Sequence, residues 1–437
     1  MEVYSADWVL PVEGRPIADG AVGVEDGRIA AVGPSSDLGG GRRFADAAIV
    51  PGFVNAHSHL EYAVYAGFGD GLADFSEWIA LHIERKRRIG WDEFVAIAEL
   101  GAADCLSSGI TTVGDCSFSG AAAVACARLG LRAIVYLEVF GSDPAEALEL
   151  FHGSHERARP AFGDLARAGV SPHTPFTASS AVYEAAAGLG LPIATHISES
   201  RSELDYLMNG GGAWTGFTEF LVEPPGTTGT RMLDALGLLG RDLVAAHCVH
   251  VDEEEIARLA ATGTGVAHCP RSNGALGCGT APLAALRTAG VNVGLGTDSP
   301  ASVPSFDFFE ELRTAVFVSR AREQRPDALL AADALELGTL GGARALALED
   351  ELGSLCPGKR ADLAVVSLAD SPYLPWEDPA GAVVFGGSPN RVMLTLVDGS
   401  VRFEKGGEEW QEVRQRATSA RSRMLTGSRS APVRTSA

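Results

Sequence analysis

Short apolar runs rich in β-branched residues recur through the middle of the chain, and longer segments of helical length separate them. Eight of these runs predict strands, at residues 47–56, 110–115, 132–140, 169–173, 191–196, 243–247, 264–269 and 291–298. Strands that alternate with helices are typical of a parallel sheet. The pattern therefore predicts an α/β domain of repeated strand–helix units over residues 51–355.

The two ends of the chain carry a different pattern, in which short apolar runs are joined by turn residues. Asp26-Gly27 lies between two such runs and predicts a β-hairpin, and similar runs recur near the C-terminus. Neither end has enough strands to bury a face by itself. We therefore expect residues 1–50 and 356–437 to share one small β-domain, with a charged helix over 408–424 and a disordered tail after it.

The charge of the chain excludes some classes of partner. Asp and Glu outnumber Lys and Arg by 56 to 35 in the 437 residues, which gives a formal net charge of −21, and no basic stripe occurs. Nucleic acids and anionic membrane surfaces are therefore not expected as partners. The sequence leaves open whether the protein forms a homo-oligomer.

The cysteines and the N-terminus indicate a cellular compartment. The seven cysteines are odd in number and form no Cys-x-x-Cys pair, which favours reduced thiols over a disulfide framework or a zinc ribbon. The N-terminus lacks the basic and apolar segments of an export signal, and no run of about 18 apolar residues occurs. We therefore expect a cytoplasmic protein without a membrane span.

Four of the predicted strands end in side chains that commonly bind metal ions. Residues two apart on an extended chain point the same way, so His57 and His59 can bind one ion together. By itself, this pair is more often two ordinary surface histidines than a metal site. In chain order, the strand ends carry His57 and His59, then His196 with Glu199 three residues later, then His247, and finally Asp298.

This order of His-x-His, His-x-x-Glu, a lone His and Thr-Asp resembles the amidohydrolase superfamily, in particular its deaminase branch with one metal ion, over nearly the whole chain. The resemblance implies a (β/α)₈ TIM-type barrel with its active site at the carboxyl ends of the strands. It also implies a small flanking β-sandwich made from both chain ends. The implied cofactor is one divalent metal ion, zinc first and iron or manganese as alternatives, with the ligands His57, His59, His196 and Asp298.

One ion rather than two is expected from the end of the fourth strand. Relatives with two ions place a carboxylated lysine or a glutamate there, whereas residues 169–175 contain neither. The chain has only three lysines, Lys86, Lys359 and Lys405, and none of them lies near this stretch of the sequence.

The resemblance assigns three catalytic roles beside the metal ion. Asp298 takes a proton from the attacking water, and Glu199 delivers protons to the ring nitrogen and to the departing amine. His247 stabilises and orients the water. For Glu199, a helix-capping glutamate is the alternative interpretation.

Further residues are expected to contact the substrate. His173 at the end of the fourth strand matches a substrate-contacting histidine of the family, with a purely structural histidine as the alternative. Trp78 is expected to stack on a base and Glu84 to hold ribose hydroxyl groups. Ser272 and Asn273 follow the seventh strand, where they can donate hydrogen bonds to the site.

Together these residues predict a metal-dependent aminohydrolase that acts on a small molecule. Metal-bound hydroxide attacks the amidine carbon of a heteroaromatic ring, and ammonia leaves. Adenine-type nucleosides are the expected substrates, and guanine, pterins or amino- and chlorotriazines are the alternative. A catalytically silent scaffold barrel is the alternative from another class of protein, but the presence of every expected ligand together with Glu199 argues against it.

Overall fold

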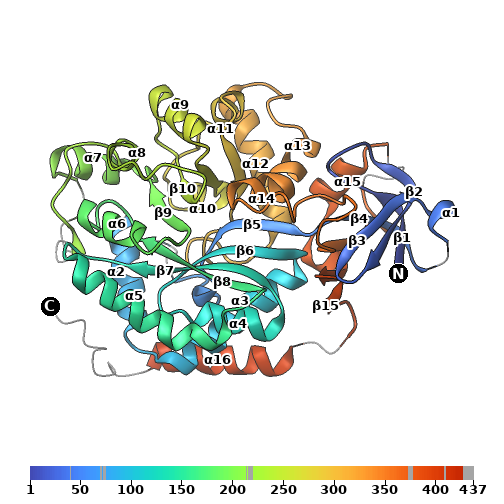
Figure 1. Ribbon diagram of the computed structural model, residues 1–437, viewed down its shortest axis with the longest axis horizontal. Helices are drawn as coiled ribbons and strands as arrows, with labels where there is room; N and C mark the ends of the chain where they lie inside the picture. The colour runs from blue at the N-terminus through green and yellow to red at the C-terminus, as the bar shows by residue number, and fades with distance from the viewer. Residues whose placement is uncertain are drawn as a thin grey trace.

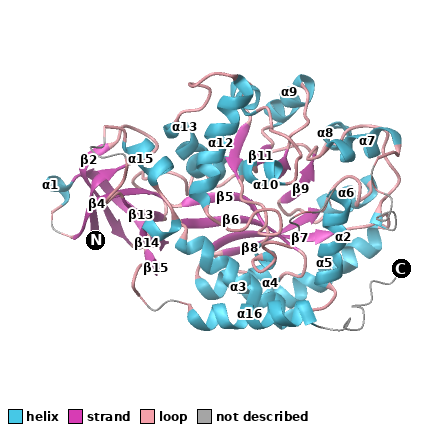
Figure 2. Cartoon of the chain, turned by 180° about the vertical axis from the view of Figure 1, so that it is seen from behind, coloured by secondary structure: helices cyan, strands magenta, loops and turns pink. Residues whose placement is uncertain are grey.

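The computed structural model describes residues 1–39, 41–68, 71, 75–212, 214, 220–372, 377–407 and 410–426. Within these residues the chain forms one parallel eight-stranded sheet and one mixed seven-stranded sheet, which lie side by side in Figure 1. Helices surround the parallel sheet, as Figure 2 shows from the opposite side. The predicted tail, residues 427–437, lies outside the described residues.

The parallel sheet curves into a barrel, which confirms the predicted fold class. Each strand lies beside the next one along the chain. The first and last strands meet at a parallel bridge between Ser58 and Asp298, where the Asp298 N–H donates to the His57 carbonyl at 3.0 Å. The strands are β5 (Phe53–Ser58), β6 (Ile110–Ser117), β7 (Arg132–Val139), β8 (Ala166–Pro172), β9 (Ile193–Ile197), β10 (Leu243–His247), β11 (Gly265–His268) and β12 (Asn292–Leu295).

Alternation along the strands divides the apolar residues of the barrel into two sets. On β7, Ala133, Val135 and Leu137 pack in the large cluster that joins the sheet to its helices. Ile134 and Tyr136 belong instead to the cluster that fills the barrel interior. The strands thus bury both faces, as a parallel barrel requires.

The helices around the barrel begin and end at conventional signals. Side chains of Asp143, Ser179, Thr228, Asp252 and Asp307 accept hydrogen bonds from the first turns of their helices. The α-helices are α2 (Phe75–Lys86), α3 (Trp91–Ser107), α4 (Ala121–Leu129), α5 (Pro144–Ala158), α6 (Ser180–Ala187), α7 (Arg201–Asn209), α8 (Gly229–Ala235), α9 (Glu253–Thr262), α10 (Pro270–Ala275), α11 (Leu283–Thr288), α12 (Phe308–Glu323), α13 (Ala331–Glu336) and α14 (Gly342–Ala345). Short 3-10 or π turns are η1 (Leu60–Tyr62), η2 (Arg159–Ala161), η4 (Leu337–Gly341) and η5 (Pro389–Arg391).

The mixed sheet combines strands from both chain ends, which confirms that one small β-domain uses both. Its strand order is β15-β14-β13-β4-β1-β2-β3, so β13 from the C-terminal part lies directly against β4 from the N-terminal part. The elements are β1 (Glu2–Val9), β2 (Ile17–Glu25), β3 (Arg28–Pro34), α1 (Ser35–Leu38), β4 (Arg42–Pro51), β13 (Leu363–Ser367), α15 (Pro379–Gly386), β14 (Val392–Val397) and β15 (Ser400–Glu404).

The prediction of a single strand over residues 47–56 is wrong. The chain changes sheets at Gly52: Pro51 pairs with Leu363 in the mixed sheet, whereas Phe53 pairs with Ile110 in the barrel. Gly52 leaves no room for a side chain, because an added Cβ would lie 2.2 Å from the Thr111 side chain. Both segments are buried, so the apolar run continues through the junction and hides it.

The C-terminal helix, α16 (Gln411–Thr426), lies against α3 of the barrel rather than on the mixed sheet (Figure 1). Its buried residues Val413, Ala417 and Ala420 face the barrel helices, and Arg416 forms an ion pair with the buried carboxylate of Glu99 at 2.7 Å. The chain therefore returns from the small sheet to the barrel before it ends.

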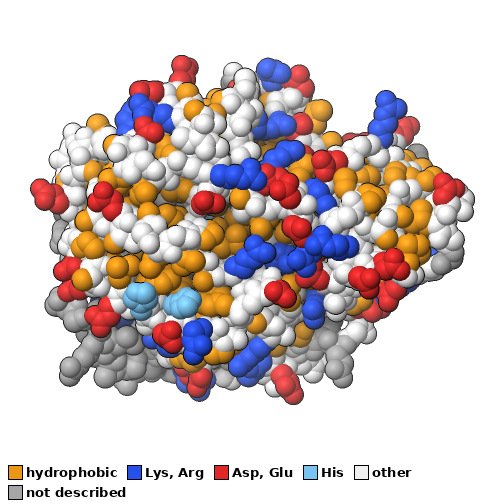
Figure 3. Space-filling model, viewed as in Figure 1, with side chains coloured by type: hydrophobic (Ala, Val, Ile, Leu, Met, Phe, Trp, Pro, Cys, Tyr) orange, Lys and Arg blue, Asp and Glu red, His pale blue; other side chains and the backbone are white. Residues whose placement is uncertain are grey.

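The surface carries mixed charge. On the face shown in Figure 3, Lys and Arg side chains lie among Asp and Glu side chains. Among the described helices, none combines the length and the apolar character that a bilayer crossing needs.

Candidate active site

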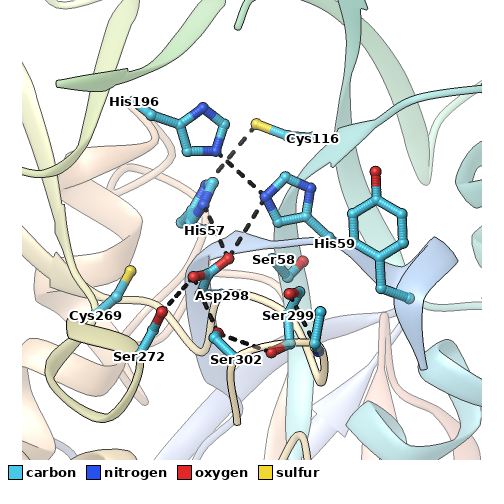
Figure 4. Close-up of polar contacts among 12 residues, drawn as sticks. His57, Ser58, His59, Cys116, His196, Cys269, Ser272, Asp298, Ser299 and Ser302 are labelled. Carbon is cyan, nitrogen blue, oxygen red and sulfur yellow. Dashed lines mark hydrogen bonds and ion pairs between the residues drawn. The ribbon is translucent and has the colours of Figure 1, made fainter. Parts of the chain in front are cut away.

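Three strands of the barrel bring four predicted metal ligands together at their carboxyl ends. His57 lies on β5 and His59 directly after it, His196 lies on β9, and Asp298 follows β12. Their side chains point toward one another in Figure 4. All four are buried, with exposures between 1% and 6%.

The distances among these groups fit one bound cation. Nε2 of His59 lies 3.3 Å from Nε2 of His196 and 3.5 Å from Oδ1 of Asp298. Nε2 of His57 lies 3.7 Å from the same carboxylate oxygen and has no hydrogen bond in the described part of the chain. Three imidazoles and a carboxylate are a common ligand set for a divalent metal ion.

Electrostatics favours the protonation states that metal ligands need. Burial lowers the pKa of His59 well below its usual value and that of His196 to about 4, and in both cases the nearby His57 adds to the effect. Burial opposes ionisation of Asp298, but the adjacent His57 imidazole and the other surrounding histidines hold the pKa of its carboxyl below the usual range. Neutral imidazoles and an ionised carboxylate are therefore available at neutral pH.

Neighbouring groups orient the first and third histidines. Nδ1 of His196 donates to the His173 carbonyl at 2.7 Å, which turns Nε2 toward the other ligands. Nδ1 of His57 faces the Cys116 sulfur at 3.8 Å. Burial raises the pKa of Cys116 well above its usual value, so a neutral thiol rather than a thiolate lies there.

Glu199 and His247 lie directly beside the four residues. Oε1 of Glu199 is 3.7 Å from Nδ1 of His247, and the ligand atoms of Glu199, His247 and Asp298 all lie within 4.8 Å of one another. Burial raises the pKa of the Glu199 carboxyl well above its usual value, and the charges of Asp298 and Glu203 add to this. Glu199 can therefore carry a proton at neutral pH.

Glu203 holds the turn that carries Glu199. Its carboxylate accepts the N–H groups of Ser198 at 2.6 Å and Glu199 at 2.7 Å. Ser198 has a φ of 53°, in the left-handed region, so these bonds stabilise a turn that its sequence disfavours.

Ser272 and Asn273, which were expected to donate hydrogen bonds to the site, both contact it. The Ser272 hydroxyl donates to Oδ2 of Asp298, on the opposite side of the carboxylate from His59 (Figure 4). Asn273 Nδ2 lies 3.0 Å from Nδ1 of His247. These two contacts fix the orientation of a carboxylate and an imidazole in the site.

Of the three predicted substrate contacts, His173 and Trp78 lie close to the metal-binding residues. The His173 ring lies 4.9 Å from that of His196 and bonds to Thr177 at 2.9 Å. The Trp78 indole donates to the Ala301 carbonyl at 3.1 Å, three residues after Asp298.

Glu84, however, is not brought to the site. Its side chain is half exposed and forms an ion pair with Arg88. On α2, residues four apart share a face, so Trp78, His82 and Lys86 point one way and Glu84 another. The expected contact between Glu84 and ribose hydroxyl groups is therefore withdrawn.

Two carboxylates beside the His-x-His segment were missed in the sequence. Asp115 accepts a hydrogen bond from the Ser58 hydroxyl at 2.8 Å and another from the Leu60 N–H at 2.7 Å, so it clamps the turn that carries His59. Glu138 places Oε1 at 4.0 Å from Nδ1 of His59. Glu138 follows the apolar run 133–137, and Asp115 ends the predicted strand 110–115, so these two positions were the available signals.

Comparisons with known proteins agree with this geometry. A family model described as the amidohydrolase family matches residues 48–402. The chain is 37% identical over 423 residues to a 5-methylthioadenosine/S-adenosylhomocysteine deaminase of Symbiobacterium thermophilum, which covers 92% of this chain and 93% of that protein. It is 31% identical over 407 residues to a 5′-deoxyadenosine deaminase of Methanothermobacter thermautotrophicus, covering 89% and 90% of the two chains.

A solved structure is similar over almost the whole length. It is the crystal structure of an adenosine deaminase from Xanthomonas campestris with bound zinc, which superposes with a TM-score of 0.86 at 30% sequence identity. The similarity covers 97% of this chain and 98% of that one.

Proposed function

Because the chain belongs to the amidohydrolase family, we propose that it is a zinc-dependent deaminase of an adenine-type nucleoside. The reaction replaces the exocyclic amine of the base by oxygen and releases ammonia. The observation that carries the proposal is the convergence of four buried metal-ligand side chains, with the carboxyl group of Glu199 beside them.

The metal ion is assigned to the side chains of His57, His59, His196 and Asp298. A zinc ion held there supplies hydroxide near neutral pH, because it lowers the pKa of water to about 7. Zinc accepts nitrogen and oxygen ligands in this number, and the zinc in the similar adenosine deaminase structure supports the choice of ion.

Glu199 is the proton donor in this proposal. Protonation of the ring nitrogen makes the adjacent carbon more electrophilic, and the raised pKa of Glu199 keeps a proton available for that step. After it has given up this proton, the same carboxylate can take up the proton that the newly added hydroxyl group loses and pass it to the departing amine.

Asp298 and His247 are the other two residues with proposed catalytic roles. The ionised carboxylate of Asp298 takes the proton of the nucleophile, and Ser272 holds its second oxygen in place. His247 is buried, oriented by Asn273 and 3.7 Å from Glu199, so it can donate a hydrogen bond to the reacting oxygen.

His173 and Trp78 are the proposed substrate contacts. His173 directly follows β8 and Trp78 lies on α2, and each has one ring nitrogen held by a hydrogen bond. The names of the two sequence relatives, a deaminase of 5-methylthioadenosine and S-adenosylhomocysteine and one of 5′-deoxyadenosine, support adenosines modified at the 5′ position as substrates.

The test is ammonia release from a panel of amines by the purified, zinc-loaded protein. The panel contains adenosine, 5′-deoxyadenosine, 5′-methylthioadenosine, S-adenosylhomocysteine, guanine, a pterin and an aminotriazine. We expect ammonia from one or more of the four adenine nucleosides. Release from guanine, pterin or triazine alone would refute the substrate class. A protein that takes up no zinc and releases no ammonia from any compound of the panel would refute the enzyme assignment.

A further inference from the structure

Glu138 is a buried carboxyl group beside the metal-binding residues that the chemistry above does not use. It is the last inward-facing residue of β7, after Ile134 and Tyr136 in the barrel interior. Its side chain is 2% exposed and makes no hydrogen bond within the described part of the chain. Burying a carboxylate is costly unless it has a partner, so this position needs a physical reason.

The histidine nearest to Glu138 turns its other nitrogen toward the ligands. Nε2 of His59 faces His196 and Asp298, at 3.3 and 3.5 Å. A neutral imidazole that offers the lone pair of Nε2 carries its proton on Nδ1. His59 therefore needs an acceptor on its Nδ1 side.

The other two histidines already have a group on that side. Nδ1 of His196 donates to the carbonyl of His173, and Nδ1 of His57 faces the sulfur of Cys116. Nδ1 of His59 is buried and without a hydrogen bond in the described chain, and Glu138 is the carboxylate that faces it at 4.0 Å.

We propose that Glu138 is a positioning residue, which accepts a hydrogen bond from Nδ1–H of His59 and so fixes the ring with Nε2 toward the metal ion. The inference rests on the proposed metal-binding role of His59. Closing the gap from 4.0 Å to an ordinary hydrogen bond takes about 1 Å of side-chain movement. Carboxylates behind metal-binding histidines also make the imidazole a stronger ligand.

Lys86 supplies the opposite charge. Its ammonium group donates to the Tyr62 hydroxyl at 2.9 Å, and the Tyr62 ring stacks on His59 with centroids 5.4 Å apart. Lys86 has no carboxylate within 4.0 Å among the described residues, so it favours the ionised form of Glu138 without occupying the oxygens that His59 needs.

The test compares zinc affinities of full-length variants that have been stripped with a chelator and titrated with ZnCl₂ against a chromophoric competitor. Glu138→Gln keeps the shape of the side chain but removes its charge, and Glu138→Leu removes the acceptor altogether. Glu99→Gln is the matched control, because Glu99 is a buried carboxylate with two arginine partners in the outer helical layer.

We expect Glu138→Gln to bind zinc 10- to 100-fold more weakly than the wild type, the usual loss when a carboxylate behind a ligand is removed. Glu138→Leu should lose at least as much, and Glu99→Gln should bind zinc normally even if it unfolds at a lower temperature. With CoCl₂ in place of zinc, Glu138→Gln should also show a changed visible absorption spectrum, which a loss of stability alone would not produce.

Two results separate this inference from the proposed function. Zinc affinity of Glu138→Gln within twofold of the wild type, or an equal loss in Glu99→Gln, overturns the role of Glu138 and leaves the deaminase proposal intact. A wild-type protein that binds no zinc overturns the metal site and, with it, this inference. Should Glu138→Leu fail to fold, Glu138→Gln alone decides the question.

Discussion

Asn55 and Thr297 exchange two hydrogen bonds across the seam where the first and last strands of the barrel meet. Asn55 Nδ2 donates to the Thr297 hydroxyl at 2.8 Å, and the Thr297 N–H donates to Asn55 Oδ1 at 2.9 Å. Both side chains are fully buried. His57 stands two residues after Asn55, and Asp298 directly follows Thr297, so this pair sets how the two metal-binding side chains face each other.

Thr297→Val removes the hydroxyl while keeping the size of the side chain. The Asn55 amide then loses its buried acceptor, and an unsatisfied buried donor costs about 1–3 kcal/mol. We expect the free energy of unfolding to fall by about that amount, together with a weaker zinc affinity. Urea denaturation and zinc titration measure the two effects.

Thr112→Val in the neighbouring strand is the matched control. Thr112 is equally buried, but its hydroxyl has no hydrogen bond in the described chain. Replacing it with valine should leave the stability unchanged or raise it slightly. Similar losses in both variants would contradict a special role for the bond between Asn55 and Thr297.

Glu199→Gln should keep the metal ion and lose turnover. The amide cannot deliver a proton, and general acid catalysis typically contributes 10²- to 10⁴-fold to the rate, so we expect kcat to fall by at least about 100-fold. Asp298→Ala and His57→Ala should instead lose zinc and turnover together. Metal content and initial rates, measured on the same preparations, distinguish the two outcomes.

The control for this experiment is Glu84→Gln. Glu84 lies on the outer face of α2 in an ion pair with Arg88, so this substitution should change neither zinc content nor kcat. A Glu199→Gln variant as active as Glu84→Gln would remove Glu199 from the proposed chemistry.

The metal-binding group could be predicted because its signals are local. His57 and His59 are two residues apart at a strand end, and the later ligands also stand where apolar runs stop. The family resemblance then indicated that these ligands, which lie far apart in the sequence, belong to one site. Asp115 and Glu138 were missed because the direction of a side chain depends on the phase of its strand, which the sequence alone does not fix. For Asp115, the irregular pairing of β5 with β6 adds to this.

Two other errors have similar physical causes. The family resemblance suggested that Glu84 contacts the substrate, but the turn of α2 carries it to a different face from Trp78. The junction at Gly52 was hidden because strands buried in two different sheets have the same apolar composition. In both cases the local sequence does not determine how the segment is oriented in the fold.

The rate should fall at alkaline pH. Burial, with the charges of Asp298 and Glu203, raises the pKa of Glu199, and an acid that must carry its proton works below its pKa and fails above it. We therefore expect kcat/KM to decline as the pH rises through this raised pKa, and the residual activity of Glu199→Gln to lack that decline. A wild-type rate that continues to increase across the alkaline range would contradict the assignment of Glu199 as the acid.

The barrel and the mixed sheet are joined by a buried ion pair whose loss should affect stability alone. Arg132, at the start of β7, bonds through two nitrogens to Asp362 at 3.2 and 3.3 Å, just before β13. Arg132 also bonds to Asp398 at 2.6 Å, so Asp362→Ala removes one of its two carboxylate partners. The variant should lower the free energy of unfolding by about 1–3 kcal/mol, the cost of leaving buried donors without their acceptor. Zinc affinity should not change, because the pair lies at the opposite end of β7 from the site.

Asp327→Ala, which breaks an exposed pair with Arg325, is the control and should have no measurable effect. A loss of zinc binding in folded Asp362→Ala would show that the two sheets are coupled to the metal-binding residues.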